Sequence, residues 1–424
     1  MKEEKPIIVV GAGIIGLFTA YYLLQEGEKV LVLDKGTGQD GCSFGNAGMV
    51  VPSHFIPLAA PGMIEKGIKW MFDSESPFYI KPRMSLSLMK WGFSFYKAAN
   101  QKKVDNAIPV LRDIGLLSKK LYQDLNHKKL FDFSFEEKGL LMLCKSEEAL
   151  HEETEVAALA NKIGIEARVL TKQEVCDLEP EIKPDVSGGV FFTGDTHLYP
   201  NQLVAELRKY LIAAGVEIKF DTELIDIECN STAVERLKVR ESNGEPYLLE
   251  AKKVVLATGS WSEQVGKQIN LNIPVQAGKG YSLTNPQVAG KELFTPSIFV
   301  EARVAITPML DQIRFGGTME IGGINAEINK NRVNGILKAI PKYFPEYEVP
   351  YPAENKIWSG LRPCSPDGMP YIGQHQRYKN LYFNTGHAMM GISLATGSGK
   401  LISELVTNKK LSMSTQDFSI HRFD

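Results

Sequence analysis

The sequence has few cysteines and no long hydrophobic run. Its five cysteines are scattered over 424 residues, and no two of them are spaced Cys-x-x-Cys. A dispersed, odd set favours reduced thiols in a cytosolic compartment over a disulfide framework or a zinc site, so we expect no metal. The N-terminus lacks a secretion signal, and no stretch is apolar for long enough to cross a bilayer. We therefore expect a cytoplasmic protein that is soluble or peripheral to the inner face of the membrane.

An excess of charge of either sign is also absent. The chain has 48 lysines and arginines against 50 aspartates and glutamates, without a long run of one sign. Nothing in this balance favours nucleic acid or a strongly charged partner. The length allows two or three domains that can bury a large cofactor. Because no internal repeat or flexible linker is present, we expect the domains to interleave.

What the sequence does have is a glycine-rich turn directly after its first strand. Residues 7–10 run into Gly11-Ala12-Gly13-Ile14-Ile15-Gly16, which opens an apolar helix. The first glycine permits the turn, the second leaves room for phosphates and the third lets helix and sheet pack closely. A second strand over 29–33 ends in Asp34, where a carboxylate can bind a ribose diol. This order predicts a dinucleotide pocket.

Two later junctions between strand and loop resemble the first in character. A buried-type strand over 253–256 leads into the small residues 257–259, where backbone can approach a ligand closely. Near the C-terminus, a strand over 381–384 leads into a tight loop at 386–391, and a helix follows over 396–406. We expect the three junctions to line one crevice.

The remaining segments have a different character and predict further elements. The predicted elements are a helix over 200–214, a β-meander over 222–250, an aromatic-rich stretch over 55–100, an amphipathic helix over 106–126, and two antiparallel strands over 298–320 around a turn at 309–312.

Four stretches in this order are specific enough to identify a family. They read Ser-Phe-Gly-Asn-Ala-Gly at 43–48, Lys-Gly-Tyr-Ser-Leu-Thr at 279–284, Gly-Leu-Arg-Pro at 360–363 and Gly-His-Ala-Met-Met-Gly at 386–391. With the opening motif they span nearly the whole chain. The sequence thereby resembles the bacterial flavin-dependent amino-acid oxidoreductases of the D-amino-acid oxidase and glycine oxidase type, most closely the D-amino-acid dehydrogenases.

The resemblance implies an α/β protein with FAD as its cofactor. A Rossmann-like FAD-binding domain would consist of the discontinuous segments 1–54, 186–267 and 355–424. An interleaved α+β substrate domain, comprising 55–185 and 268–354, would be built on a mixed β-sheet that roofs the flavin.

The resemblance also implies an activity in amino-acid catabolism. A D-amino acid would undergo oxidative deamination to a 2-oxo acid and ammonia, with the Cα hydrogen passing to the flavin as hydride and the electrons passing on to a non-oxygen acceptor such as a quinone. D-proline or D-hydroxyproline dehydrogenation and a glycine or sarcosine oxidase activity remain open. So do a nicotinamide enzyme on the same fold and a flavoprotein without turnover.

The expected cofactor contacts combine the three junctions with the Asn-Ala-Gly loop. They are Gly11, Gly13, Ile14, Ile15, Gly16, Asp34, Lys35, Ser43, Asn46, Ala47, Gly48, Met49, Ala257, Thr258, Gly259, Gly386, Met390, Gly391 and Ile392.

The chemistry needs a group that holds the substrate carboxylate. A guanidinium suits this role because its planar fork donates two parallel hydrogen bonds, and we assign it to Arg362. Tyr281 is a second candidate for the carboxylate. His387 and His54 lie close to the expected flavin loops and are candidates for tuning the ring or for contacting substrate.

Several segments depart from the family or have no assigned role. The family usually has Trp at Phe44, and Cys and Gln at Thr196 and His197, so the substrate preference stays open. Arg314 and Glu320 are expected at solvated strand ends. The apolar stretch over 84–96 packs in a core or forms a docking surface for the membrane or an electron acceptor.

Overall fold

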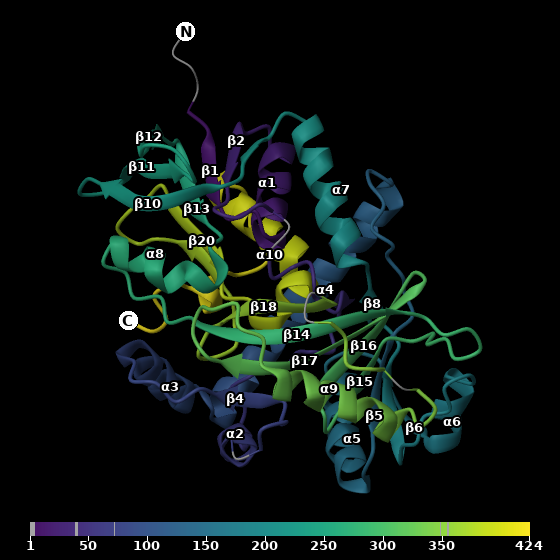
Figure 1. The fold of residues 1–424 in the computed structure, drawn as a ribbon. Coiled ribbons are helices and arrows are strands. Elements are labelled where there is room, and N and C mark those ends of the chain that lie inside the picture. Colours follow the sequence, from purple (N-terminus) through teal and green to yellow (C-terminus); the bar gives the residue numbers. More distant parts are fainter. Residues whose placement is uncertain (1–4, 39–40, 72, 348, 354–355) are drawn as a thin grey trace.

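The computed structural model describes residues 5–38, 41–71, 73–347, 349–353 and 356–424. Two large sheets dominate it, one in each half of the view in Figure 1. The first has six strands, all parallel except for the pair at one edge. In spatial order these are β19 (Tyr371–Gln374), β20 (Leu381–Thr385), β13 (Lys253–Leu256), β1 (Ile7–Val10), β2 (Val30–Leu33) and β9 (Glu217–Lys219).

The six-stranded sheet is buried on both faces, because alternate residues of each strand enter different cores. Ile7 and Val9 pack with helices α1 (Ile14–Gln25), α7 (Pro200–Ala213) and α10 (Gly391–Val406). Ile8 and Val10 pack under a three-stranded sheet and α8. That sheet consists of β10 (Thr222–Cys229), β11 (Val234–Glu241) and β12 (Tyr247–Glu250), and α8 spans Ser262–Gln268.

The second sheet has nine strands and is mixed. Two of its pairings are parallel, β5 with β15 and β4 with β17, and the others are antiparallel. In spatial order its strands are β18 (Ile357–Cys364), β14 (Gln276–Pro286), β17 (Gln312–Ile321), β16 (Val304–Met309), β15 (Ser297–Phe299), β5 (Leu140–Cys144), β7 (Gly188–Phe192) and β6 (Ala167–Thr171), with β4 (Phe78–Ile80) beside β17.

Helix α9 (Lys330–Tyr343) covers one face of the nine-stranded sheet, where it contributes to a core that also contains Tyr281 and Phe315. The opposite face at β14 and β18 turns toward the six-stranded sheet (Figure 1). The remaining helices are α2 (Met63–Met71), α3 (Leu86–Ala98), α4 (Gln101–Lys128), α5 (Glu147–Lys162) and α6 (Lys172–Leu178). Two further short strands, β3 (Met49–Val50) and β8 (Thr196–His197), pair with each other in a separate two-stranded sheet.

The predicted α/β class and the mixed second sheet are confirmed. The strands around the turn at 309–312 and the helix after Tyr199 also form where they were predicted. Helix α4 is longer than predicted, and α10 begins at Gly391 rather than at residue 396. Glycine, serine and threonine have low helix propensity at this start, but burial of most of α10 outweighs that preference.

The two sheets divide the chain differently from the predicted domain ranges. Strands β7 and β18 fall in ranges assigned to the FAD-binding domain, yet both pair within the nine-stranded sheet. We therefore propose that these strands belong to the substrate domain. The predicted boundary between residues 354 and 355 lies outside the described residues.

Among the described helices, none combines the length and the apolar character that a bilayer crossing requires.

Candidate functional site

The turn between β1 and α1 lacks side chains where they would collide with the backbone. A Cβ on Gly11 would lie 2.4 Å from the carbonyl oxygen of Ala257, and a Cβ on Gly16 would lie 1.8 Å from that of Gly11. A Cβ on Gly13 would have only the Ser43 hydroxyl nearby, at 3.9 Å, so this position faces open space. Helix α1 has no side-chain cap at Gly13. Its N-terminus thus fits a pyrophosphate.

Two polar side chains shape this turn. The Ser43 hydroxyl accepts a hydrogen bond of 3.1 Å from the N–H of Ile14. The Asp34 carboxylate accepts 2.6 Å and 2.8 Å bonds from the N–H groups of Ala12 and Gly36. The acid expected at the ribose is therefore located at the end of β2, where it also fixes the glycine-rich turn. Ile15 lies in the first turn of α1, partly buried against the core.

A surface hollow of about 420 Å³, lined by exposed polar and charged residues, opens next to this point. Its lining residues are Lys35, Asp221, Glu223, Arg240 and Ser242. The ammonium group of Lys35 lies 3.9 Å from the ring centre of Trp261, which stands two residues after Gly259. A Cβ on Gly259 would meet no atom within 4 Å, so the turn over Ala257, Thr258 and Gly259 also presents bare backbone.

The C-terminal loop brings a second uncapped helix N-terminus to the crevice. Gly386 has a φ of +77° and packs against Tyr371, and Met390 caps α10 without a side-chain hydrogen bond. A Cβ on Gly391 would again meet no atom within 4 Å. The hydroxyl of Tyr122 donates 2.8 Å to the carbonyl of Ile392 and holds the first turn of α10.

The Asn-Ala-Gly loop meets the nine-stranded sheet at the same place. Met49 is buried together with Met142, and the partly buried Ala47, Ala305 and Met390 pack against this cluster. The loop at Asn46–Met49 and the loop at Met390 therefore both lie on the sheet face that points away from α9. Gly48 has a φ of +73°, and its N–H donates 2.9 Å to the Asn46 side chain.

This sheet face is built from small residues between two large side chains. Gly280 of β14 pairs with Gly360 of β18. A Cβ on Gly360 would lie 2.1 Å from the indole of Trp358, and a Cβ on Gly280 would lie 2.2 Å from the guanidinium of Arg362. Both large side chains therefore lie flat on glycine backbone. Sequence reasoning did not identify Trp358, although its alternation with Gly360 and Arg362 places all three on one face.

Arg362 has a charge that the surrounding protein does not neutralise. Its Nη1 donates to the carbonyl of Thr318, and burial lowers the pKa of Arg362 below its usual value. The other titratable groups acting on it are the thiols of Cys42 and Cys364, and within the described ranges no carboxylate pairs with it. By contrast, Arg422 binds Asp367 with two bonds of 2.7 Å and 2.9 Å.

Tyr281 lies on the other face of the sheet. Its hydroxyl donates 3.2 Å to Glu320 and accepts 3.2 Å from the N–H of Asn329. The ring is fully buried in the core beneath α9. The structure therefore does not bring Tyr281 together with Arg362, because adjacent residues of a strand point to opposite faces.

The two candidate histidines are both uncharged near neutral pH. Burial lowers the pKa of His387 to about 3, and burial with the nearby Arg303 charge lowers the pKa of His54 to about 4. The Nε2 of His387 lies 2.8 Å from the Ser398 hydroxyl, which itself donates to the Leu394 carbonyl. His387 must therefore donate from Nε2, so it ties the loop to α10.

His387 also connects the loop to the strand of Arg362, because its backbone forms an isolated bridge with Cys364. The Nδ1 of His387 is buried without a hydrogen-bond partner among the described residues. The Nδ1 of His54 lies 3.2 Å from the Ser53 hydroxyl, a group that also donates to Asp195.

The divergent residues of the 194–199 segment are both buried. The Thr196 hydroxyl donates 3.3 Å to the carbonyl of Val50, and the backbone of His197 pairs with Met49. Burial lowers the pKa of His197 to about 4. This segment therefore holds the residues that directly follow the Asn-Ala-Gly loop, Met49 and Val50.

Arg314 and Glu320 are not at solvated strand ends, so that expectation is wrong. The side chains are 4 % and 6 % exposed. Glu320 joins the network of Tyr281, and Arg314 donates to carbonyls of the Asn-Ala-Gly loop. Their charges predicted exposure to solvent. The loop that covers Arg314 on β17 comes from a distant part of the sequence, so the sequence around β17 gave no sign of this burial.

The comparison with protein families gives one match that covers most of the chain. Residues 6–405 match the family described as FAD dependent oxidoreductase. The glycine-rich turn before α1, the open positions at Gly13, Gly259 and Gly391, and the small-residue sheet face fit a large dinucleotide such as FAD.

Relatives of known name support the same family. The D-amino acid dehydrogenase of Vibrio atlanticus is 33 % identical over 428 residues, covering 98 % of this chain and 99 % of that protein. The D-amino acid dehydrogenase of Helicobacter pylori is 30 % identical over 402 residues, covering 95 % of each. Among solved structures, glycine oxidase from Geobacillus kaustophilus superposes with a TM-score of 0.77 at 24 % identity, covering 99 % of this chain and 98 % of that one.

Proposed function

The chain belongs to the FAD dependent oxidoreductase family, and from this premise we propose that it is a D-amino-acid dehydrogenase. In the proposed reaction, a D-amino acid and water yield a 2-oxo acid and ammonia while two electrons leave the substrate. The observation that carries the substrate class is Arg362, an arginine without a carboxylate partner in the described structure that lies on the small-residue sheet face. The names of the relatives in Vibrio atlanticus and Helicobacter pylori point to the same class.

FAD, when bound, supplies the hydride acceptor that no side chain provides. The residues of the chain then have to hold and orient the substrate. We assign to Arg362 the clamping of the carboxylate through two charge-assisted hydrogen bonds, and to Trp358 the apolar wall beside it. The N-terminus of α10 offers N–H groups to an electron-rich ring edge. His387 holds this loop in place, and His54 remains a candidate for contact with substrate.

An anaerobic substrate panel tests this proposal. The purified holoenzyme is mixed with D-amino acids, their L-enantiomers, glycine, sarcosine, D-proline and D-hydroxyproline, and the flavin absorbance is followed. Bleaching by several D-amino acids but not by L-enantiomers supports the proposal. Bleaching confined to D-proline and D-hydroxyproline, or to glycine and sarcosine, replaces it with those activities. A colourless protein that takes up no added FAD contradicts it.

The same experiment addresses the electron acceptor. We propose that the electrons leave to a quinone-type acceptor rather than to oxygen. After anaerobic reduction, air and a soluble quinone are added in separate mixtures. Rapid colour recovery with quinone and slow recovery with air is the expected result, and rapid recovery with air would identify an oxidase.

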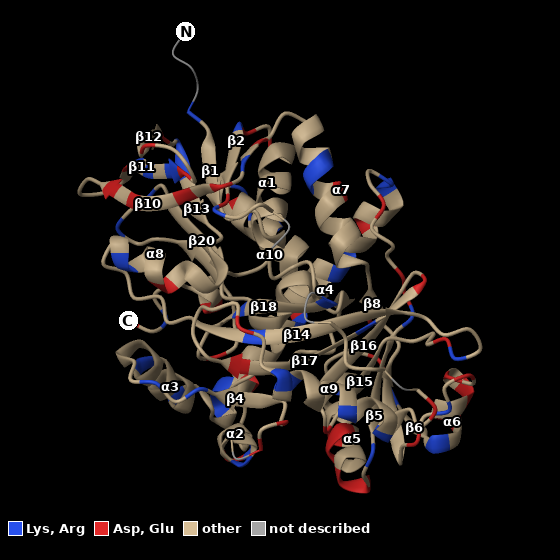
Figure 2. Ribbon diagram, in the orientation of Figure 1, with Lys and Arg blue, Asp and Glu red and all other residues tan. Residues whose placement is uncertain are grey.

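We propose further that the enzyme contacts an anionic bilayer surface on the cytoplasmic side. Helix α3 and the segment before it expose Met84, Leu86, Met89, Phe93 and Tyr96. The sequence from residue 76 to residue 104 contains six lysines and arginines and no acidic residue, in a chain with a net charge of −2. Figure 2 shows these basic residues on α3 and near β4. Exposed apolar side chains flanked by cations suit the interface of an anionic membrane.

Vesicle sedimentation tests this surface. We expect binding to vesicles with anionic lipid, weaker binding at high salt and little binding to neutral vesicles. Replacing Met84, Met89 and Phe93 together by serine should abolish it. Serine substitution of Val288 and Leu310, exposed on other parts of the surface, provides the matched control. If the same fraction of both variants sediments with the anionic vesicles, the proposal is contradicted.

A further inference from the structure

Arg314 is a buried cation beside the Asn-Ala-Gly loop, and all three of its guanidinium nitrogens donate hydrogen bonds. It lies on β17 with a side chain that is 4 % exposed. Its Nη1 donates 3.0 Å to the carbonyl of Phe44 and 2.8 Å to that of Asn46. Its Nε donates 2.9 Å to the Thr284 hydroxyl, and its Nη2 donates 3.0 Å to the Asn201 side chain. One side chain therefore joins the nine-stranded sheet, the Asn-Ala-Gly loop and helix α7.

All acceptors of Arg314 are uncharged. They are two backbone carbonyls, one hydroxyl and one amide, and its cation lies 5.9 Å from the ring centre of Tyr199. Within the part of the chain that the structure describes, no carboxylate pairs with it. Burial lowers the pKa of Arg314 to about 10, so the guanidinium remains charged at neutral pH. A full positive charge is thus present under the loop without a neutralising partner.

The two carbonyl contacts also determine which way the loop presents its N–H groups. In a trans peptide the C=O and N–H point in opposite directions, and no cis peptide occurs among the described residues. Because the carbonyls of Phe44 and Asn46 point at Arg314, the N–H groups of Gly45 and Ala47 point away from it. The hydrogen bonds of the described structure include no acceptor for either N–H.

The other hydrogen bonds between this loop and distant residues hold the part of the loop from Gly48 onward. The N–H of Leu198 donates 2.8 Å to the carbonyl of Gly48, and the N–H of Val51 donates 2.9 Å to Ser393 of α10. These bonds fix the end of the loop after Ala47. Among the described residues, the hydrogen bonds that reach the peptides before it from the sheet side come from the Arg314 guanidinium, apart from short-range turns, and the Trp358 indole packs against Gly45.

We propose that Arg314 is a positioning residue that sets the Asn-Ala-Gly loop to donate N–H groups to FAD and that its charge favours the reduced cofactor. This inference rests on the proposed function, in which the same loop lies along the flavin. A nearby cation stabilises added negative charge, so the midpoint potential of the bound flavin is higher with Arg314 than without it. Loss of the fork weakens FAD binding because the two N–H groups are no longer held in place.

Two substitutions separate the charge from the geometry. Arg314→Met removes both, and Arg314→Lys keeps the charge but cannot reach all four acceptors. Arg332→Met serves as the matched control. Arg332 is 2 % exposed and also donates to neutral groups, the carbonyls of Asp73 and Ser76, but it lies on α9 on the other side of the sheet. The measurements are the FAD dissociation constant from apoprotein titration, the flavin absorption spectrum, the midpoint potential and the thermal unfolding midpoint.

Arg314→Met should weaken FAD binding at least tenfold, shift the flavin spectrum and lower the midpoint potential. Arg314→Lys should weaken binding but keep a potential close to that of the unchanged chain. Arg332→Met should lower the unfolding temperature and leave the potential and the spectrum unchanged. If Arg314→Met does not fold, Arg314→Lys decides: an FAD dissociation constant no higher than that of the unchanged chain, or a midpoint potential clearly below it, overturns the inference.

The proposal is also overturned if Arg314→Met binds FAD with the potential and spectrum of the unchanged chain. That outcome leaves the proposed function intact, because the unchanged chain still binds FAD and oxidises its substrate. An unchanged chain without affinity for FAD is a different outcome, since it removes the proposed function together with this inference.

Discussion

At the scale of single residues, the arginines of this chain differ in what neutralises them. Arg422 pairs with Asp367 through two bonds, whereas Arg362 donates to a backbone carbonyl and has no described carboxylate partner. A charged group that keeps its capacity for a carboxylate is available to a ligand, and one that is already paired contributes to the fold. The presence or absence of a carboxylate partner thus distinguishes the two arginines, and the ligand-binding role of Arg362 is part of the proposed function.

The substitution Arg362→Ala should raise the KM for D-amino acids steeply while FAD stays bound. Loss of two charge-assisted hydrogen bonds costs about 3 kcal/mol, or roughly 100-fold in kcat/KM. Steady-state kinetics and the flavin spectrum check this. Arg422→Ala is the control, which should lower the unfolding temperature and leave KM unchanged. An unchanged KM in Arg362→Ala would exclude this residue from the site.

A change at Gly280 should act on Arg362 without removing its charge. A Cβ there would lie 2.2 Å from the guanidinium, so Gly280→Ala has to displace it. We expect a KM increase of roughly tenfold or more with FAD still bound. Gly373 is also on a strand, and a Cβ there would meet no atom within 4 Å, so Gly373→Ala should leave KM unaltered. Equal kinetics in both variants would contradict the placement of Arg362.

The local backbone was predicted well where a motif fixes it, whereas the face of a strand that a distant segment covers was predicted poorly. The glycines at 11, 13 and 16 follow from the contacts that a turn requires. Tyr281 is covered by α9, and Arg314 is covered by the Asn-Ala-Gly loop. The sequence does not show which side of a strand such a distant loop or helix will cover. The assignment of Arg362 remains a prediction.

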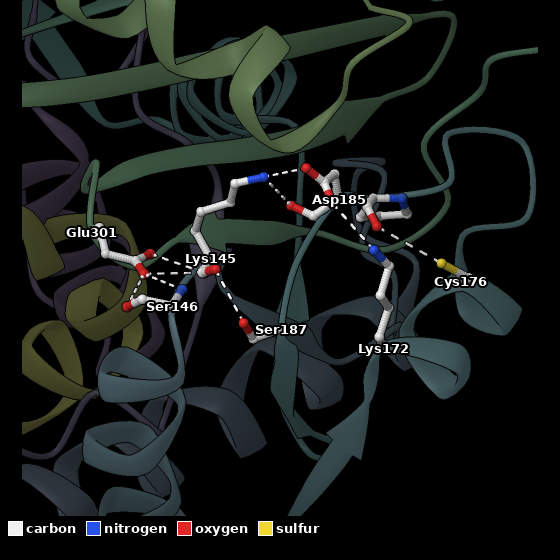
Figure 3. Close-up of polar contacts among 8 residues, drawn as sticks. Lys145, Ser146, Lys172, Cys176, Asp185, Ser187 and Glu301 are labelled. Atoms are coloured by element: carbon white, nitrogen blue, oxygen red, sulfur yellow. Dashed lines mark hydrogen bonds and ion pairs between the residues drawn. The ribbon is translucent and has the colours of Figure 1, made fainter.

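At the scale of elements, the N-terminus of helix α5 is held by Glu301, which lies in the turn between β15 and β16. Glu301 accepts 3.0 Å and 2.9 Å bonds from the N–H groups of Lys145 and Ser146, and 2.9 Å from the Ser146 hydroxyl. Figure 3 shows this contact beside the ion pairs of Asp185 with Lys145 and Lys172. Burial would raise the pKa of Glu301, but hydrogen bonds from Tyr343 and the backbone lower it below its usual value.

Glu301→Ala should therefore destabilise the protein by about 1–3 kcal/mol, because four donors, including the Tyr343 hydroxyl, lose their acceptor. Its contribution is present at neutral pH and is lost as the pH falls through the lowered pKa of the carboxylate. Asp185→Ala removes only exposed ion pairs and should cost about 1 kcal/mol or less. Urea unfolding at neutral and acidic pH measures both. Equal losses for the two variants would contradict the capping role of Glu301.

The elements themselves were largely predictable from local patterns. Alternation in the strands around 309–312 and the buried run at 253–256 gave the observed strands, because both signals depend only on neighbours in sequence. The start of α10 was placed too late, since its first turns contain residues that disfavour helix and are stabilised by packing. Local propensity cannot show such packing.

At the scale of the whole molecule, buried titratable groups set the response to pH. Burial lowers the pKa of four histidines, His54, His197 and His375 to about 4 and His387 to about 3. Burial also raises the pKa of Asp195 and of Glu179 to about 7. Between about pH 4 and 6.5, these histidines are neutral in the folded protein and become protonated when it unfolds. Over about the same range, the two carboxyls are protonated in the folded protein and lose their protons when it unfolds.

The stability of the protein should rise as the pH increases from about 4 to 6.5. Four histidines favour the folded state with rising pH, on the order of 3 kcal/mol each, and two carboxyls oppose them. Asp195→Asn removes one opposing group, so its unfolding temperature should rise more steeply over this range. Asp185→Asn, at an exposed position, should follow the unchanged chain. Thermal unfolding at a series of pH values checks this, and a flat profile would contradict it.

The arrangement of the two sheets was predictable in outline but not in its boundaries. Composition and motifs indicated two interleaved units, and the family implied a mixed sheet. The strands at 188–192 and 357–364 belong to the nine-stranded sheet because of pairing partners far away in sequence. No local signal marks where a chain passes from one sheet to the other.

The position of β1 constrains how the protein can be made in the cell. β1 comes before the other described strands in sequence, yet it stands between β2 and β13, and β20, which pairs with the far side of β13, comes much later in the sequence. The helix α10 that packs against α1 follows later still. The six-stranded sheet is therefore complete only after β19 and β20 have been synthesised, and the nascent chain has to remain unaggregated until then. A chain that terminates before α10 lacks the helix that packs against α1.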